Sequence, residues 1–141
     1  MDQKEFREFY RTIQDVAEHP VVLRMKKYPH HGDTSCYKHC MRVAYFNYII
    51  CKKLHLDAKS AARAGMLHDL FLYDWHTHAR ETGERLHGFT HAEKAYKNAG
   101  KIFRLNRVER DVIRNHMWPV TLRSLPRTRE GWMIVLTDKY S

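Results

Sequence analysis

The sequence predicts an all-α protein, a single-domain helical bundle with five or six core helices. Apolar residues recur at helical spacing over most of the chain, and the alternation of apolar and polar residues that marks strands is absent from the sequence. The 141 residues include only six Gly and four Pro, too few for the many turns of a β-sandwich. A chain of this length can bury one core, so we expect one domain over 1–141.

The first helices are expected to form an N-terminal lead-in over 1–30, followed by the core of the domain over 31–141. Residues 2–18 carry an apolar stripe on one face. This helix is expected to end at His19, because a residue that precedes proline disfavours the α-conformation. A shorter helix is expected next.

Turn and capping residues set the bounds of the later elements. The shorter helix is expected over 21–27, and 28–33, which contains Pro and Gly, is expected to be a loop. Residues 74–89 are polar and rich in His, and we expect them to be mostly irregular. The core helices begin at capping residues and are expected over 34–54 (cap Asp33 or Thr34), 57–73 (cap Asp57), 90–100 (capping box from Thr90, stop at Gly100), 106–118 (cap Asn106, stop at Pro119), and from Thr128 or Arg129 to the end.

The sequence carries no signal for a membrane or a secreted location. It has no run of about 18 apolar residues, and its first ten residues lack the apolar stretch of a signal peptide. Cys36, Cys40 and Cys51 are odd in number and lack the spacing of a disulfide framework. We therefore expect a cytoplasmic protein with reduced thiols and no membrane partner. Its oligomeric state stays open.

The charge and the histidine content favour anionic partners and a special site. Lys and Arg total 25 against 16 Asp and Glu, which gives a net charge of +9. Such a surplus suits phosphorylated metabolites, nucleotides or nucleic acid, although a solvated basic surface alone would account for it. Eleven His are harder to explain by solubility, and they call for a metal or an acid–base function.

Six residues with imidazole or carboxylate side chains form the candidate metal site. Each is expected on a helix or at the end of one, and a helical bundle can bring such positions together around an ion. In chain order they are His39, the dipeptide His68-Asp69, His91, His116 and Asp138.

Residues from about 30 to 141 resemble the HD superfamily of metal-dependent phosphohydrolases. The core His, His-Asp and Asp pattern of that family matches His39, His68-Asp69 and Asp138. The local contexts also fit, with His-x-x-Arg-Val-Ala around the first position and Gly-Met-Leu-His-Asp around the second. The resemblance implies a helical fold of the HD-domain type and hydrolysis of a phosphoester.

Binuclear members of this family carry two further His, which match His91 and His116. The resemblance implies that Asp69 bridges two divalent transition-metal ions and that His68 and Asp69 are the catalytic residues. His39, His68 and Asp138 would complete one ion, and the two further His the other. Iron or manganese suits these ligands best, while zinc, nickel, cobalt and magnesium stay open.

Members that hydrolyse cyclic dinucleotides have a Gly-Tyr-Pro signature and a His-Asp-Ile-Gly-Lys run. Here the corresponding run is His68-Asp-Leu-Phe-Leu72, and Gly-Tyr-Pro is absent from the sequence. This departure argues against cyclic-di-GMP as the substrate.

Basic residues near the candidate ligands are expected to bind the substrate. Arg42 lies about one helical turn after His39, and Lys139 adjoins Asp138. His31 and His87 are further candidates for the pocket. A basic stretch over 123–129 could line its rim.

Three functions compete on the sequence alone. The first is a phosphatase or phosphodiesterase that uses a metal-activated water on a nucleotide or another small phosphorylated compound. The second is a di-iron oxygenase of the HD type, which would use the same ligands. The third is a non-catalytic nucleic-acid-binding module, favoured by the charge but without a recognisable reading motif. We expect the hydrolase.

Overall fold

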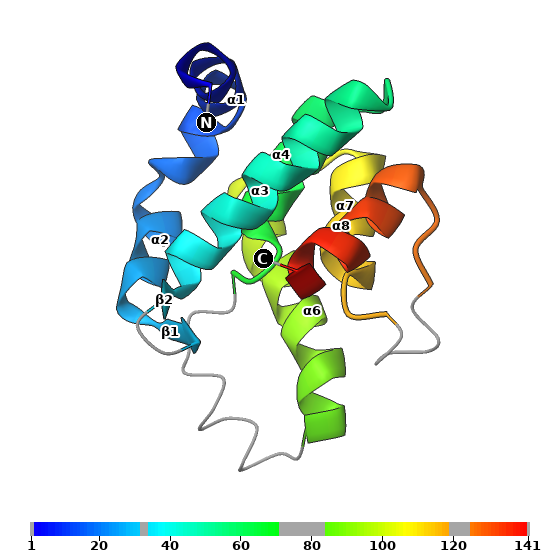
Figure 1. Cartoon of the computed structure of the whole chain (residues 1–141). Coiled ribbons are helices and arrows are strands. Elements are labelled where there is room, and N and C mark those ends of the chain that lie inside the picture. Colours follow the sequence, from blue (N-terminus) through cyan, green and yellow to red (C-terminus); the bar gives the residue numbers. More distant parts are fainter. Residues whose placement is uncertain (1, 32–33, 71–83, 119–124, 141) are drawn as a thin grey trace.

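The computed structural model is all-α, as the sequence predicts, and it describes residues 2–31, 34–70, 84–118 and 125–140 (Figure 1). Side chains are described over these ranges except at 30–31, 84–90 and 140. The described elements are α1 (Gln3–Ala17), α2 (Pro20–Leu23), the 3-10 helix η1 (Arg24–Lys27), β1 (Pro29–His31), β2 (Thr34–Ser35), α3 (Cys36–Lys53), α4 (Ala58–Leu67), α6 (Glu84–Ile102), α7 (Arg107–Asn115) and α8 (Arg129–Tyr140).

The segment expected to be a loop after η1 begins instead with a short strand. β1 pairs antiparallel with β2, with an irregular register between Pro29 and His31. Backbone hydrogen bonding across so short a hairpin needs no alternation of apolar side chains, so the sequence pattern does not reveal it. None of the helices in the described ranges combines the length and apolarity needed to span a bilayer.

Several of the expected helix bounds are wrong. α3 begins at Cys36, and its N-cap is Ser35 instead of the expected Asp33 or Thr34. α4 ends at Leu67, so His68 and Asp69 follow that helix instead of lying within it. α6 begins at Glu84, well before the capping-box signal at Thr90, and it continues past Gly100. A polar stretch can be helical when its residues have good helix propensity, as Glu, Arg and Leu do at the start of α6. The rest of the segment expected to be irregular lies outside the described residues.

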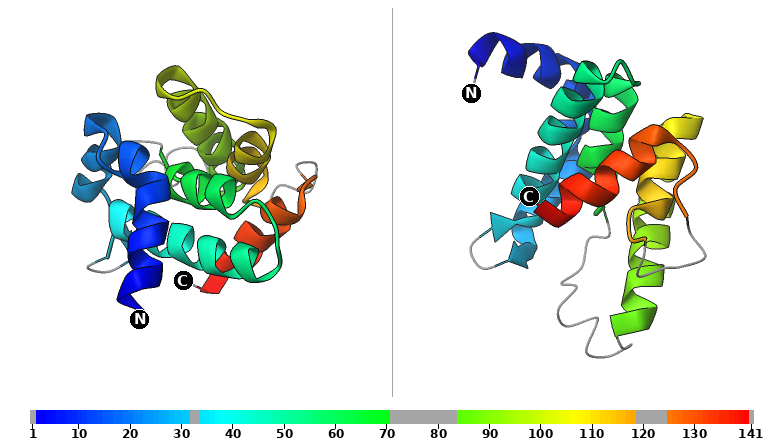
Figure 2. Two further views of the ribbon diagram at one scale, coloured as in Figure 1. Left: turned by 90° about the horizontal axis from the view of Figure 1, so that it is seen from above. Right: turned by 45° about the vertical axis from the view of Figure 1, so that its right-hand side comes forward.

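The antiparallel pair α3 and α4 forms the centre of the molecule. α1 lies on one side of this pair and α8 on the other, with α6 and α7 nearby (Figures 1 and 2). A tight turn joins the two helices: His55 has a positive φ of 57°, and the amide of Leu56 donates to the carbonyl of Cys51 at 2.8 Å. This is the hydrogen-bond pattern of a Schellman motif, with His in the place that Gly usually takes.

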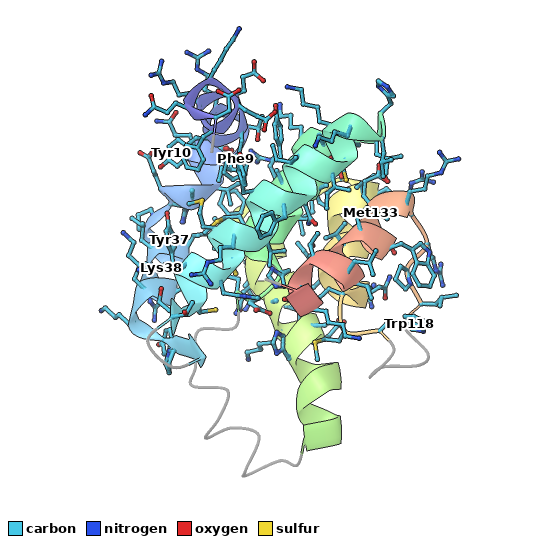
Figure 3. The ribbon with its side chains drawn as sticks, viewed as in Figure 1. Phe9, Tyr10, Tyr37, Lys38, Trp118 and Met133 are labelled. Atoms are coloured by element: carbon cyan, nitrogen blue, oxygen red, sulfur yellow. The ribbon has the colours of Figure 1, made fainter. Side chains whose placement is uncertain are left out.

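Aromatic packing holds α1 against this centre. Phe9, labelled in Figure 3, is fully buried. Its ring meets the rings of Tyr45 and Tyr48 on α3. Arg63 of α4 adds a polar anchor, because its guanidinium bonds Asp15 of α1 and Glu109 of α7. The lead-in thus packs as part of the same core as the later helices.

α3 and α4 approach each other closely at Gly65. A β-carbon added there would lie 2.8 Å from the Cα atom of Ala44, which is backbone and cannot move aside. Gly65 therefore sets how near the two central helices come, one turn before His68.

We expect Gly65→Ala to lower the free energy of unfolding by about 1–3 kcal/mol, the usual cost of overpacking. Gly100→Ala is the matched control, since Gly100 is helical and exposed and a β-carbon there would meet nothing within 4 Å. That control should gain up to about 1 kcal/mol from helix propensity. Urea denaturation of both variants measures the difference, and equal stabilities would contradict the close approach.

Candidate metal centre

The six candidate ligands from the sequence lie together at the C-terminal end of α4. α3 carries His39, α6 carries His91 and α8 carries Asp138. The other three follow helix ends: His68 is the C-cap of α4, Asp69 comes next, and His116 is the C-cap of α7. All but Asp138 are at least nine-tenths buried.

One group of donors surrounds an oxygen from each of the two carboxylates. The Nε2 atom of His39 lies 2.7 Å from Asp138 Oδ1 and 3.5 Å from Asp69 Oδ2. The Nε2 atom of His68 lies 3.2 Å and 3.3 Å from the same two oxygens. One ligand atom from each of these four residues lies within 4.8 Å of the others, a spacing that could hold an ion.

A second group uses the other oxygen of Asp69. His91 Nε2 contacts Asp69 Oδ1, and His116 Nε2 lies 3.5 Å from the same atom. The Asp69 carboxylate therefore presents Oδ2 to the first group and Oδ1 to the second. A carboxylate with its two oxygens facing two donor groups has the arrangement needed to bridge two ions.

Backbone carbonyls orient two of the imidazoles in the same way. His68 donates its Nδ1–H to the carbonyl of Gly65 at 2.6 Å, and His116 donates its Nδ1–H to the carbonyl of Ile113 at 2.7 Å. A carbonyl can only accept, so each Nδ1 carries a hydrogen and each Nε2 points to the carboxylates. Such contacts commonly orient metal-binding His.

The buried Nε2 atom of His116 indicates whether the residues of this site fit a metal ion. It has no hydrogen-bond partner among the described residues, although it lies in the interior. A buried acceptor without a donor costs free energy, and a divalent cation would satisfy it. Imidazole and carboxylate together are donors that Fe, Mn, Zn, Ni and Co accept, so the residues present fit a divalent ion.

The electrostatics of the metal-free site also favour a cation there. Burial alone would lower the pKa of His68, but the carboxylates of Asp69 and Asp138 raise it to about 10. Burial would raise the pKa of Asp69, but the charge of His68 and the neighbouring His hold it well below its usual range. Burial lowers the pKa of His91. The metal-free protein therefore holds a proton on His68 between two ionised carboxylates.

Buried hydrogen bonds place α8, and with it Asp138, on the two central helices. Thr137 donates its hydroxyl to Asn47 Oδ1 at 2.6 Å, and Asn47 Nδ2 donates to the carbonyl of Ala61 at 3.3 Å. Asn47 is fully buried and lies two turns after His39. This chain of contacts joins α3 and α8, which carry His39 and Asp138, to α4, which His68 and Asp69 directly follow.

Asp111 holds the start of α8. Its carboxylate accepts the amides of Arg127 and Thr128, at 2.9 and 3.0 Å, and the hydroxyl of Thr128 at 2.6 Å. Sequence reasoning identified neither this residue nor the pair Asn47 and Thr137, because a single Asp, Asn or Thr on a helix carries no pattern. The only available signal was their place on helices that also carry candidate ligands.

The proposed substrate residues are only partly described. Arg42 is exposed on α3, and Lys139 is exposed on α8 next to Asp138. The side chains of His31 and His87 lie outside the described residues, as does part of the basic stretch 123–129. The remainder of that stretch is held to α7 by Asp111.

The fold is that of an HD domain, and the chain belongs to the HD domain family. The model of that family matches residues 36–141. Over 91 residues the chain is 30% identical to the Bacillus subtilis (strain 168) protein named "Putative phosphohydrolase YueE", a match that covers 61% of this chain and 48% of that protein. The chain thus spans about half the length of this curated relative. No solved structure matches the chain significantly.

The raised pKa of His68 predicts how the stability of the chelated protein depends on pH. A pKa of about 10 in the folded state, against an ordinary value of 6.5, means that folding favours the protonated form. This contribution is fully present below pH 6.5 and is lost as the pH rises through about 10. We therefore expect a lower free energy of unfolding at pH 9.5 than at pH 6.5, measured by urea denaturation with chelator present.

Two variants separate this effect from other titrations. His68→Gln should lose most of the fall in stability between the two pH values. His55→Asn, which changes an exposed His in a turn, should keep it. The same pH dependence in His68→Gln and in the wild type would contradict the assignment.

Proposed function

We propose that this chain is a metal-dependent phosphohydrolase, a phosphatase or phosphodiesterase that acts on a nucleotide or another small phosphorylated compound. The observation that carries the proposal is the Asp69 carboxylate, whose two oxygens face two separate groups of buried nitrogen and oxygen donors. Membership of the HD domain family and the name of the Bacillus subtilis relative support the same reaction class.

We assign two divalent transition-metal ions to this centre, with Fe or Mn favoured by the mixed ligands. His39, His68, Asp69 and Asp138 would hold one ion, and Asp69, His91 and His116 the other. When bound, such ions lower the pKa of water toward neutrality and neutralise phosphate charge. Asp69 sets the separation of the two positions, and His68 contributes its Nε2 atom once its proton has left.

The chain's own residues would then orient the substrate. Arg42 is exposed on α3 one turn after His39, and its guanidinium can donate two parallel hydrogen bonds to phosphate oxygens. Lys139 adds a second positive charge beside Asp138. The net charge of +9 favours the approach of a small anion.

A substrate panel tests the proposed reaction. Protein is chelated, reloaded with Mn²⁺ in oxygen-free buffer, and assayed with phosphomonoesters, phosphodiesters and nucleotides by phosphate release and chromatography. Turnover that depends on added Mn²⁺ is expected. Turnover that requires oxygen and iron instead would favour the oxygenase. Chelator-resistant, salt-sensitive binding of RNA or DNA without turnover would favour the nucleic-acid-binding module.

The shared carboxylate makes a stoichiometric prediction. Asp69→Ala should lose both ions, because it removes a ligand from each donor group, whereas Asp138→Ala should lose only one. Elemental analysis of protein purified without chelator measures both variants beside the wild type. Two ions retained in Asp69→Ala would contradict the bridging assignment.

The role of Arg42 makes a kinetic prediction. Arg42→Ala should keep the wild-type metal content and lower kcat/KM for the best substrate of the panel by about tenfold or more, in line with loss of a charge-assisted hydrogen bond. Arg42→Lys should restore part of the loss, because lysine keeps the charge without the planar fork. Lys53→Ala, an exposed cation at the far end of α3, is the control.

Loss of metal together with activity in Arg42→Ala would show that Arg42 supports the helix instead of contacting the substrate. Wild-type kinetics in Arg42→Ala would exclude both roles. The search for the phosphate contact would then move to Lys139.

A further inference from the structure

Three sulfur atoms meet in the core beside the metal centre. Met25 of η1 lies against Cys36 and Cys40 of α3, with its Sδ atom 3.8 Å from Cys36 Sγ and 4.0 Å from Cys40 Sγ. Met25 and Cys40 are fully buried, and Cys36 is 2% exposed. We call these three residues the sulfur cluster. The function proposed above uses none of them.

The two thiols of the sulfur cluster lie mainly against other sulfur atoms and the backbone and ring groups next to them. Cys36 Sγ faces the thioether and, at 3.5 Å, the backbone carbonyl of Asp69. Cys40 Sγ lies 3.9 Å from His68 Nδ1, but that nitrogen already donates to the carbonyl of Gly65. Thioether and thiol sulfur are poor hydrogen-bond acceptors. The Cys36 thiol therefore has one carbonyl acceptor, whereas the contacts of Cys40 with the thioether and with His68 Nδ1 offer its thiol no good acceptor.

The geometry of the sulfur cluster points to a second metal site, and we propose that it binds one thiophilic divalent ion of the zinc and cadmium class. Three sulfurs placed around an ion in one plane, each about 2.3 Å from it, lie about 4 Å apart. Met25 Sδ has this spacing from both thiol sulfurs. The two Sγ atoms and a carboxylate oxygen of Asp69 lie within 4.8 Å of one another, so a fourth ligand is within reach.

Charge balance favours a divalent ion over a monovalent one. Binding releases one proton from each thiol to solvent, and two thiolates with one divalent ion leave the sulfur cluster neutral. A monovalent ion would leave a net negative charge in the interior, which is costly. Cys36 is also the first residue of α3, an 18-residue helix, and a helix N-terminus stabilises a thiolate.

The sulfur cluster differs from the neighbouring metal centre in chemistry, although both can use Asp69. Thiolate and thioether select soft ions, whereas imidazole and carboxylate accept harder ones. The proposal does not rest on the proposed function, because it needs only Met25, Cys36 and Cys40. If Asp69 is the fourth ligand, a soft ion in the sulfur cluster would compete with Mn²⁺ for that residue.

Cadmium titration tests the proposal. Reduced, metal-free full-length protein is equilibrated with Cd²⁺ against a chelating competitor, and the ultraviolet thiolate-to-cadmium charge-transfer band is recorded. We expect one equivalent of Cd²⁺ to produce this band. Cys36→Ser and Cys40→Ser should each weaken the affinity that the band reports at least tenfold. Met25→Leu, which keeps a similar volume, should weaken it less.

Two controls keep the outcome clear. Cys51→Ser changes the third buried Cys, which lies at the other end of α3, and it should keep the band. His91→Ala, which removes a ligand of the nitrogen and oxygen centre but none of the sulfur cluster, should keep it as well. If that centre binds no metal, the band is unaffected, so failure of the proposed function and failure of this proposal are distinguishable.

Three results would overturn the proposal: no band at one equivalent of Cd²⁺, a band that survives in both Cys36→Ser and Cys40→Ser, or a band lost in Cys51→Ser. Circular dichroism of each variant confirms that it is folded. If a serine variant does not fold, Met25→Leu decides the matter. A Cd²⁺ affinity unchanged from wild type in that variant would exclude the thioether as a ligand, and the sulfur cluster would then not be the site.

Discussion

The carboxylate of Asp69 is the point on which the arrangement of this site depends. It is nearly fully buried, and four imidazoles, from two helices and two helix ends, approach its two oxygens. An ionised carboxylate can be buried only if positive charge or donors surround it. In the metal-free protein the proton on His68 provides part of that charge. The helices must therefore pack so that all these nitrogens converge on one residue.

The way α4 ends allows this convergence. Within a continuous helix, neighbouring side chains diverge by about 100°. α4 stops at Leu67, yet His68 keeps αR backbone angles, and its Nε2 atom reaches an oxygen of Asp69 and an oxygen of Asp138. The hydrogen bond from His68 Nδ1 to the carbonyl of Gly65 closes the helix and directs the ring in one contact. α7 ends in the same way at His116.

Much of the fold and of the candidate site could be predicted from the sequence, because helical periodicity and caps are local signals. The order of His39, His68-Asp69 and Asp138 could be recognised for the same reason. The end of α4 could not, because the apolar pattern continues through Leu70. The pairing of Asn47 with Thr137 spans 90 residues and leaves no pattern in either segment.

The same contacts make the metal-free site a cost to folding. His116 Nε2 lies buried without a hydrogen-bond partner among the described residues. Burial also lowers the pKa of His91, which favours its neutral form. Each of these groups would be better solvated in the unfolded chain, so the core and the hydrogen bonds of Asn47 and Asp111 must offset their burial. A divalent cation removes both penalties at once, because it binds imidazole nitrogens and takes the place of the His68 proton. Metal binding, proton release and folding are therefore coupled in this domain. The strength of this coupling depends on how closely the packing of α3, α4 and α8 keeps the donor atoms in place when no ion is bound.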